Sequence, residues 1–147
     1  MADEYDVVVI GGGLAGMTAG LFAARYGLRT GLVERMMGGA QIINIEKIEN
    51  FPGFPQGISG AELAPAIQEQ AMDSGVEFIM AEASTISSEG DTKVVATDAG
   101  EYRAKAVIIA AGSTLRQLGI PGEEELFGRG VSQCATCDGP LYSGQVV

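Results

Sequence analysis

The sequence VVVIGGGLAG at residues 7–16 joins a run of branched apolar residues to a glycine-rich turn. The apolar run over residues 5–10 is typical of a strand that is buried on both faces of a parallel sheet. Gly11, Gly13 and Gly16 follow at the spacing G-x-G-x-x-G, and an alanine-rich helical pattern begins in the same stretch. The stretch therefore predicts a strand, a tight turn and a helix at the start of an α/β domain.

The residues after the turn predict a site for a dinucleotide. The helical pattern extends over residues 14–26, and a second strand is expected over residues 29–34. Glu34 ends that strand, where its carboxylate can accept hydrogen bonds from ribose hydroxyls. Glycines let the backbone and the helix N-terminus approach a pyrophosphate. Such glycines can also reflect tight packing without a ligand, but the strand, the helix and the acid occur here in the expected order. The pattern does not distinguish FAD from a nicotinamide.

The rest of the chain predicts further strands and one more helix. Residues 59–62, SGAE, form a capping-box pattern that opens a helix to about residue 74, with a kink or a late start at Pro65. A long ordered loop is expected over residues 36–55. Residues 107–111 are typical of another buried parallel strand. Short strands that could form a small antiparallel sheet are expected at residues 76–81, 85–88, 93–97 and 101–105.

Length and charge limit the classes of function. The chain has 147 residues, enough for one domain with a sizeable core. Its formal net charge of −10 argues against nonspecific binding to nucleic acid or to an anionic membrane. The first apolar run is too short and glycine-rich for a secretory leader, and no long apolar span follows, so we expect a cytoplasmic location. A change to Gly, Pro and acidic residues after Gly112 favours a domain over residues 1–115 and a linker with the start of a second domain over 116–147.

The sequence CATCDG at residues 134–139 contains both cysteines of the chain. Two thiols at this spacing can close an easily reduced ring, in which one sulfur resolves the mixed disulfide that the other forms. Asp138 can supply the proton that a leaving thiolate needs, a task for which the chain has no histidine. The alternatives are half of a zinc site or two inert buried thiols. Because no histidine or second cysteine pair is present to complete a zinc site, we predict no metal.

Six features of the chain resemble those of one family of flavoproteins. In chain order they are GGGLAG (11–16), Glu34, GGAQIINIEKIENFPGFP (38–55), VIIAAGS (107–113), LGIPGE (118–123) and GRGVSQCATCDG (128–139). The series is similar to the N-terminal part of the low-molecular-weight thioredoxin reductases and covers nearly the whole chain. The resemblance implies an α/β fold with a Rossmann-like FAD-binding domain, in which a parallel sheet with helices is joined by a small antiparallel β-sheet. It also implies that this domain is incomplete at its C-terminus.

The resemblance further implies a set of FAD contacts. Asn50 matches the asparagine that faces the flavin, and Gly39 and Gln41 match the family's Gly-Gly-Gln loop. Ala40 stands between the last two, a one-residue departure from the family pattern. The residues assigned to FAD are Gly11, Gly12, Gly13, Ala15 and Gly16 around the pyrophosphate, Glu34 on the ribose, and Gly39, Gln41, Asn50, Ala111 and Gly112.

For the cysteine motif, the resemblance implies a path for electrons. Cys137 matches the sulfur that lies against the flavin, Cys134 matches the sulfur that exchanges with the protein substrate, and Asp138 matches the general acid. Electrons would pass from NADPH or NADH through FAD to the Cys134–Cys137 disulfide and on to a thioredoxin-like protein. A homodimer is expected for the full-length form, because the family is typically dimeric.

Full-length members of this family continue with segments that this sequence does not contain. These are a second glycine fingerprint for NADPH and a C-terminal Gly-Asp segment that closes the FAD site. We therefore expect an N-terminal fragment that does not turn over alone. The alternatives are a relative that reduces a peroxiredoxin or takes electrons from ferredoxin, and an FAD-binding module without catalysis.

Overall fold

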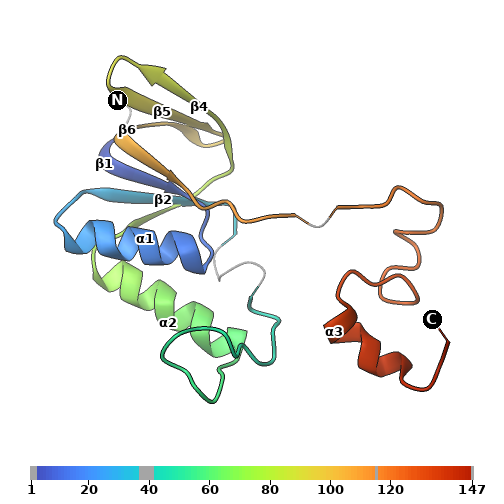
Figure 1. The fold of residues 1–147 in the computed structure, drawn as a ribbon. Coiled ribbons are helices and arrows are strands. Elements are labelled where there is room, and N and C mark those ends of the chain that lie inside the picture. The colour runs from blue at the N-terminus through green and yellow to red at the C-terminus, as the bar shows by residue number, and fades with distance from the viewer. Residues whose placement is uncertain (1–2, 37–41, 115, 147) are drawn as a thin grey trace. The chain divides into compact units, whose positions relative to one another are not determined.

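The chain divides into two compact units, which are described separately (Figure 1). The structure, a computed structural model, describes residues 3–36, 42–114 and 116–146, without the side chains of residues 3, 136 and 137. Unit 1 is Met1–Gly112 and unit 2 is Ser113–Val147. Among the described residues, no helix combines the length and the apolar character needed to cross a membrane.

The described residues of unit 1 form one six-stranded sheet. Its strands are β1 (Asp3–Ile10), β2 (Thr30–Glu34), β3 (Glu77–Met80), β4 (Ala83–Glu89), β5 (Thr92–Thr97) and β6 (Gly100–Ile109). They lie in the order β3-β2-β1-β6-β5-β4. The first four strands in this order are parallel, and β5 pairs antiparallel with both β6 and β4. The predicted α/β fold class, with parallel and antiparallel strands and helices, is confirmed.

Strand β6 replaces the two strands expected at residues 101–105 and 107–111. It is continuous, and it pairs antiparallel with β5 and parallel with β1. Its first half alternates the charged Arg103 and Lys105 with other residues, as in a half-exposed strand, whereas its end is entirely apolar. This change of pattern within one strand gives the sequence the appearance of two elements. The antiparallel strands therefore continue the parallel sheet. The expectation that residues 76–81 join the antiparallel strands is wrong, because β3 pairs parallel with β2.

Two helices lie together on one face of the sheet (Figure 1). Helix α1 spans Leu14–Arg25, and the chain leaves it through Gly27, whose φ of 80° is in the left-handed region that favours glycine. Helix α2 spans Gly60–Asp73. The predicted capping box is confirmed, because the Ser59 hydroxyl accepts from the Glu62 N–H while the Glu62 carboxylate accepts from the Ser59 N–H.

Helix α2 begins directly after Ser59, so the expected late start at Pro65 is wrong. Proline lacks an N–H group and removes one hydrogen bond from the helix. The capping box fixes the first turn, and Leu63 and Ile67 are buried on either side of the exposed proline. These contacts offset the lost bond, and the helix continues through it.

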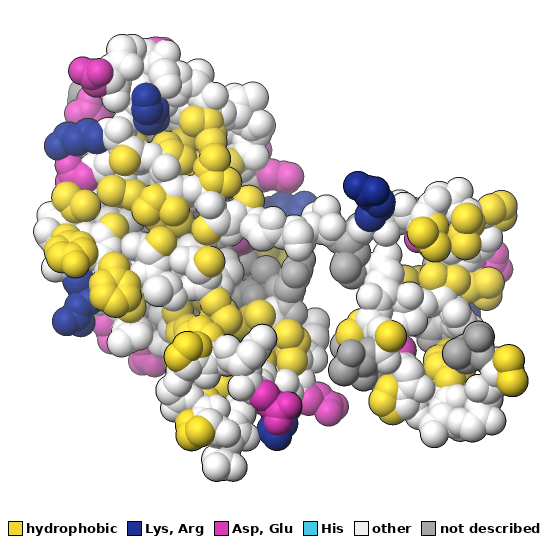
Figure 2. All heavy atoms as spheres, viewed as in Figure 1, with side chains coloured by type: hydrophobic (Ala, Val, Ile, Leu, Met, Phe, Trp, Pro, Cys, Tyr) yellow, Lys and Arg dark blue, Asp and Glu magenta, His cyan; other side chains and the backbone are white. Residues whose placement is uncertain are grey.

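The core lies on both faces of β1. Val9 is fully buried in a cluster with Met17 of α1 and Leu63 of α2. Val8 points to the opposite face, where it packs with Val33 and other buried residues. Burial on both faces explains the continuous apolar run in the sequence. On the face shown in Figure 2, the charged side chains of unit 1 lie mainly near its margins.

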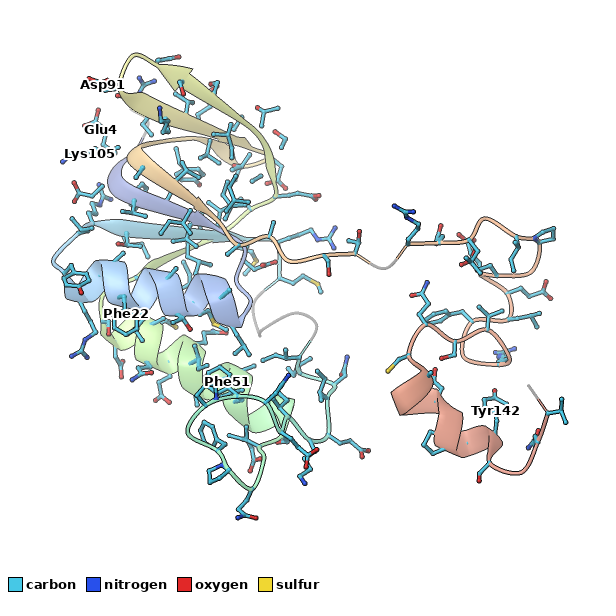
Figure 3. All side chains as sticks on the ribbon, in the orientation of Figure 1. Glu4, Phe22, Phe51, Asp91, Lys105 and Tyr142 are labelled. Carbon is cyan, nitrogen blue, oxygen red and sulfur yellow. The ribbon has the colours of Figure 1, made fainter. Side chains whose placement is uncertain are left out.

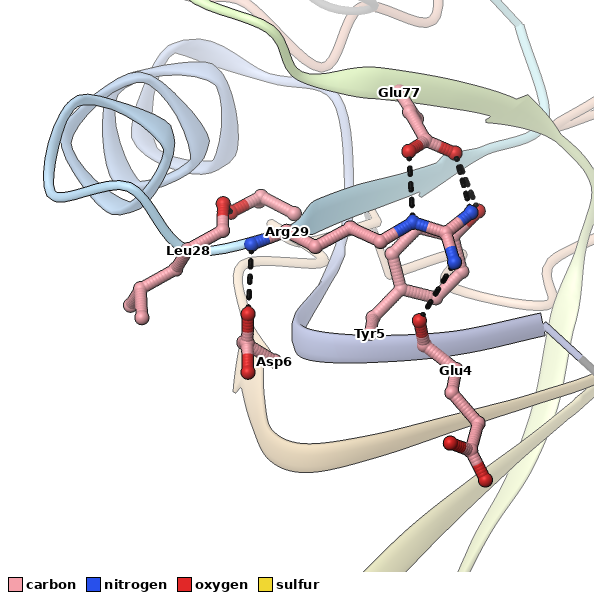
Figure 4. Close-up of polar contacts among 7 residues, drawn as sticks. Glu4, Tyr5, Asp6, Leu28, Arg29 and Glu77 are labelled. Atoms are coloured by element: carbon pink, nitrogen blue, oxygen red, sulfur yellow. Dashed lines mark hydrogen bonds and ion pairs between the residues drawn. The ribbon is translucent and has the colours of Figure 1, made fainter.

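An arginine joins several strands at the amino end of the parallel sheet (Figure 4). Arg29 donates from Nε to Glu77 Oε1 at 3.0 Å and from Nη1 to the backbone oxygen of Glu4 at 2.9 Å. Its guanidinium carbon lies 4.6 Å from the centre of the Tyr5 ring, a cation–π distance. The hydrogen bond from Arg29, and with it a weaker contribution from the Tyr5 hydroxyl, holds the pKa of Glu77 below its ordinary value.

A second ion pair lies at the same end of the sheet. Lys105 Nζ is 2.6 Å from Asp6 Oδ1 and ties β6 to β1. This hydrogen bond lowers the pKa of Asp6 and raises the pKa of Lys105. The negative charge of Glu4 also raises the pKa of Lys105. Figure 3 shows Glu4 and Lys105 together at this end of the sheet.

Unit 2 contains the cysteine motif. Its described residues include the helix α3 (Ala135–Asp138) and the 3-10 turn η1 (Gly139–Tyr142). Before them, the buried carboxylate of Glu123 accepts hydrogen bonds from the N–H groups of Leu118 at 2.8 Å and Gly119 at 2.7 Å. These bonds, that of Leu118 first, hold the pKa of Glu123 below its ordinary value. They close the loop formed by the LGIPGE sequence.

Candidate functional site

Two glycines of the turn after β1 are required by backbone packing alone. A β-carbon at Gly11 would lie 2.2 Å from the carbonyl oxygen of Ala110, and the φ of 106° is unfavourable for other residues. A β-carbon at Gly16 would lie 1.8 Å from the carbonyl oxygen of Gly11. Tight packing, the simpler interpretation of the glycine pattern, therefore accounts for these two positions.

Glu34 lies against the same turn. Its Oε2 accepts the N–H of Gly12 at 2.6 Å, and its Oε1 accepts the N–H of Met36 at 3.1 Å. A β-carbon at Gly12 would stand 2.7 Å from Cγ of Glu34, so the glycine makes room for this side chain. The carboxylate is thus held at the end of β2 and beside the glycine turn.

Gly13 differs from its neighbours because packing does not require it. A β-carbon built on Gly13 meets nothing within 4 Å. Gly13 is also the N-cap of α1, and the helix has no side-chain cap at this end in the described part of the chain. The N–H groups of the first turn and the helix dipole favour an anion there. The open space in front of a helix N-terminus fits a pyrophosphate group.

The strand order places these residues at a known type of ligand crevice. The chain passes from β1 to β2 on one side, and β6 lies on the other side of β1. In open α/β sheets, ligands bind outside the carboxyl ends of the strands at such a switch point. The exit from β6 also approaches the turn, because a β-carbon at Gly11 would lie 2.9 Å from Cα of Ala111. Gly112 follows with a φ of 67°.

A cavity of about 450 Å³ opens beside the start of α1. Asn50 and Leu14 both line it, so a predicted flavin contact is brought to the helix that follows the glycine turn. The loop that carries Asn50 is held by paired backbone bonds between Ile48 and Ile58. The other lining residues are Ile42, Ile45, Lys47, Ile48, Glu49 and Phe51. Figure 3 shows Phe51 on this loop, beside α2.

The structure does not reach every residue assigned to FAD. Gly39 and Gln41 lie outside the described residues. Ala15 is exposed on the first turn of α1, next to the open position at Gly13. Gly11, Gly12, Glu34 and Ala111 are brought together by the contacts given above.

The cysteine motif forms a short turn in unit 2. Cys134 is half-buried and disulfide-bonded, and the sequence contains one other cysteine, Cys137. The backbone of Cys137 belongs to α3, and its side chain lies outside the described part of the structure. The N–H of Asp138 donates to the carbonyl oxygen of Cys134 at 2.9 Å, which closes the turn.

Ser132 is not among the residues predicted from the sequence, yet it contacts both Cys134 and Asp138. Its Oγ accepts the N–H of Cys134 at 3.1 Å and donates to Oδ2 of Asp138 at 2.7 Å. A serine that accepts the N–H two residues later is a known turn motif, so its spacing to Cys134 was a usable signal. Its contact with Asp138 depends on the closure of the turn. The arrangement links the side chain of Asp138 to the backbone of Cys134 through one hydroxyl group.

Known proteins that are similar to this chain include several thioredoxin reductases. The chain is 45% identical over 147 residues to the thioredoxin reductase of Bacillus subtilis. The alignment covers 99% of this chain and 46% of that protein. It is 46% identical over 142 residues to the bifunctional thioredoxin reductase/thioredoxin of Mycobacterium leprae, covering 96% of this chain and 31% of that protein. The crystal structure of Lactococcus lactis thioredoxin reductase in its FR conformation superimposes with a TM-score of 0.81 at 45% identity, over 94% of this chain and 45% of that one.

The chain thus spans less than half of each of these relatives. The family model described as pyridine nucleotide-disulphide oxidoreductase matches residues 5–145, which include both the glycine turn and the cysteine motif. With a match over nearly its whole length, the chain belongs to the pyridine nucleotide-disulphide oxidoreductase family.

Proposed function

We propose that this chain is the FAD-binding and disulfide-bearing part of an enzyme of the thioredoxin reductase type. The observation that carries the proposal is the Ser132 hydroxyl, which bonds both the backbone of Cys134 and the carboxylate of Asp138. Asp138, the proton donor in this proposal, is thereby linked to the backbone of a disulfide-bonded cysteine. The open helix N-terminus at Gly13 in unit 1 adds a place for a dinucleotide.

In this proposal FAD occupies the crevice at the carboxyl ends of the parallel strands. The N–H groups around Gly13 and Ala15 bind the pyrophosphate, and Glu34 accepts hydrogen bonds from the ribose. Asn50 lines the cavity that would receive the ring system. Gly39, Gln41, Ala111 and Gly112 are further contacts on the same proposal. When bound, FAD supplies the two-electron transfer from a nicotinamide to a disulfide.

The residues of the cysteine motif then carry out exchange with a protein. Reduction of the Cys134–Cys137 disulfide takes up two electrons and two protons. Asp138 provides one of the protons to the leaving thiolate. The Cys134 thiolate attacks a disulfide of a thioredoxin-like protein and forms a mixed disulfide. Cys137 attacks the Cys134 sulfur, which releases the reduced protein and restores the original disulfide. We place this reaction in the cytoplasm and in a homodimer of the full-length form.

The alternative activities receive less support. The named relatives in the comparisons above are thioredoxin reductases and not peroxiredoxin reductases. An FAD-binding module without catalysis would have no use for a cysteine pair with an adjacent acid.

Single-turnover exchange with an oxidised thioredoxin tests the proposal without any electron donor. The chain is reduced with dithiothreitol, freed of it by gel filtration and mixed with the oxidised protein. We expect one thioredoxin disulfide reduced per chain. The Cys137→Ser variant should accumulate the mixed disulfide, and the matched Cys134→Ser variant should do neither. Transfer by Cys134→Ser at the wild-type rate, or no transfer by the wild-type chain, would contradict the proposal.

A further inference from the structure

The hydroxyl of Ser132 is shared between the two ends of the cysteine turn. It lies two residues before Cys134 and six residues before Asp138. The Cys134 N–H occupies one lone pair of Oγ at 3.1 Å. The hydroxyl proton is directed to Oδ2 of Asp138 at 2.7 Å, a distance typical of a strong O–H···O bond. A serine hydroxyl can donate only one hydrogen bond, and Ser132 donates it to Asp138.

This contact distinguishes one carboxylate oxygen from the other. Since Oδ2 already accepts a hydrogen bond from the Ser132 hydroxyl, Oδ1 is the oxygen more open to carry the proton that Asp138 transfers. The Asp138 N–H bond to the Cys134 carbonyl, at 2.9 Å, fixes the backbone of the same residue. Two bonds thus hold Asp138, one at its backbone and one at its side chain. An aspartate on a short turn would otherwise exchange among its rotamers.

We infer that Ser132 is a positioning residue for Asp138, and that it orients the acid so that Oδ1 can protonate the leaving thiolate during disulfide cleavage. This inference rests on the role given to Asp138 in the proposed function. Ser132 itself exchanges no proton with the reacting sulfurs. Its contribution is to keep the acid in one orientation beside the Cys134 turn.

A purely structural role for Ser132 makes a different prediction. The bond to the Cys134 N–H alone would form a serine turn that shapes the backbone, whatever the side chain of Asp138 does. In that case the loss of the hydroxyl would act independently of Asp138. If Ser132 acts through Asp138, its loss has no further effect once the acid has been removed.

The rate at which dithiothreitol reduces the disulfide of the full chain separates these possibilities, and it needs no flavin or nicotinamide. A thiolate of dithiothreitol attacks the Cys134 sulfur, the disulfide bond breaks, and the leaving Cys137 thiolate takes a proton from Asp138. The second thiol of the reagent then closes its own ring and frees the Cys134 thiol. The measured quantity is the pseudo-first-order rate constant at pH 7.

We expect Ser132→Ala to slow this reaction about tenfold, a part of the roughly 100-fold or more that general acid catalysis can contribute. Ser132→Thr keeps the hydroxyl and should restore most of the rate. Asp138→Asn should be slower than Ser132→Ala, and the double variant should be no slower than Asp138→Asn. Ser143→Ala, at an exposed serine of the same unit, is the matched control and should leave the rate unchanged.

Each other result overturns a defined statement. A wild-type rate for Ser132→Ala, or effects of Ser132→Ala and Asp138→Asn that multiply, would overturn the positioning role while leaving Asp138 as the acid. A wild-type rate for Asp138→Asn would instead remove the acid from the proposed function. Circular dichroism spectra of all variants establish that the compared chains are equally folded.

Discussion

The amino end and the carboxyl end of the parallel strands in unit 1 are built from different chemistry. At the amino end, long charged side chains meet: Arg29 pairs with Glu77, and Lys105 pairs with Asp6. At the carboxyl end, the turns after β1 and β6 consist of glycine and alanine, and Glu34 beside them accepts backbone N–H groups. One end satisfies its charges internally, and the other leaves a helix N-terminus open at Gly13.

The difference shows how one sheet separates stability from binding. Ion pairs at the amino end join strands that are far apart in the sequence, and no ligand is needed to complete them. At the carboxyl end the backbone donates toward open space, which is favourable only when an anion is present. Substitutions at the amino end should therefore change unfolding, whereas those at open positions of the carboxyl end should change ligand affinity.

The largest effect is expected for Gly11→Ala. The new β-carbon would overlap the Ala110 carbonyl, and the φ of 106° would be strained. Together these effects should lower the free energy of unfolding by about 3 kcal/mol. Urea denaturation followed by circular dichroism measures it. A loss below about 1 kcal/mol would show that the turn can open to accept a side chain.

Gly13→Ala is the matched variant two residues away. Because its β-carbon meets no atom within 4 Å, the free energy of unfolding should change by only about 0.5 kcal/mol. The methyl group would instead occupy the space in front of α1, and the dissociation constant of FAD, measured by fluorescence titration, should rise at least roughly tenfold. An equal loss of stability in both variants would remove the distinction between packed and open glycines.

Arg29→Ala tests the contribution of the amino end of the sheet to stability. It removes an ion pair, a cation–π contact and a bond to the Glu4 carbonyl, so we expect a loss of about 1–2 kcal/mol in the free energy of unfolding. The control is Arg35→Ala, whose pair with Glu82 is longer, 3.8 Å, and more exposed. It should change stability by less than about 0.5 kcal/mol. FAD affinity should be unaffected by either variant.

The smallest effect is expected for the stability of the chain at low pH. The lowered pKa of Glu77 means that its contribution is fully present above the ordinary glutamate pKa of about 4.3, and is lost as the pH falls through the lowered value. Stability should therefore decline more steeply below about pH 4.3 in the wild-type chain than in Glu77→Gln. Melting temperatures measured across this range provide the comparison. Parallel pH curves for the two chains would show that Glu77 makes no such contribution.

Much of unit 1 could be predicted from local patterns. The apolar run of β1, the glycines and the capping box at Ser59 each have a physical cause within a few residues. The pair of Arg29 and Glu77 could not be found this way, because its members are 48 residues apart and meet only when β2 and β3 lie side by side. Strand β6 was divided in two because its neighbours differ along its length.

The candidate site likewise has features that could be predicted from the sequence and features that could not. The spacing of the glycines and the position of Glu34 at the end of β2 are properties of the sequence, and the contact between Gly12 and Glu34 follows from them. The different requirements at Gly11 and Gly13 could not be read from the sequence, since the clash at Gly11 depends on where Ala110 lies and the space at Gly13 is seen only in the folded turn. Ser132 was missed because its bond to Asp138 requires a folded turn.

The double pairing of β6 has a consequence for how the chain reaches its fold. β1 is synthesised before β6, one of its two neighbours, which lies about a hundred residues later, as the pairing of Val7 with Ala106 shows. Until that neighbour arrives, a central apolar strand presents an unprotected edge to other chains. Contacts of such long sequence separation form slowly. Nascent chains of this protein should accordingly depend on chaperones most strongly in the interval before β6 has left the ribosome.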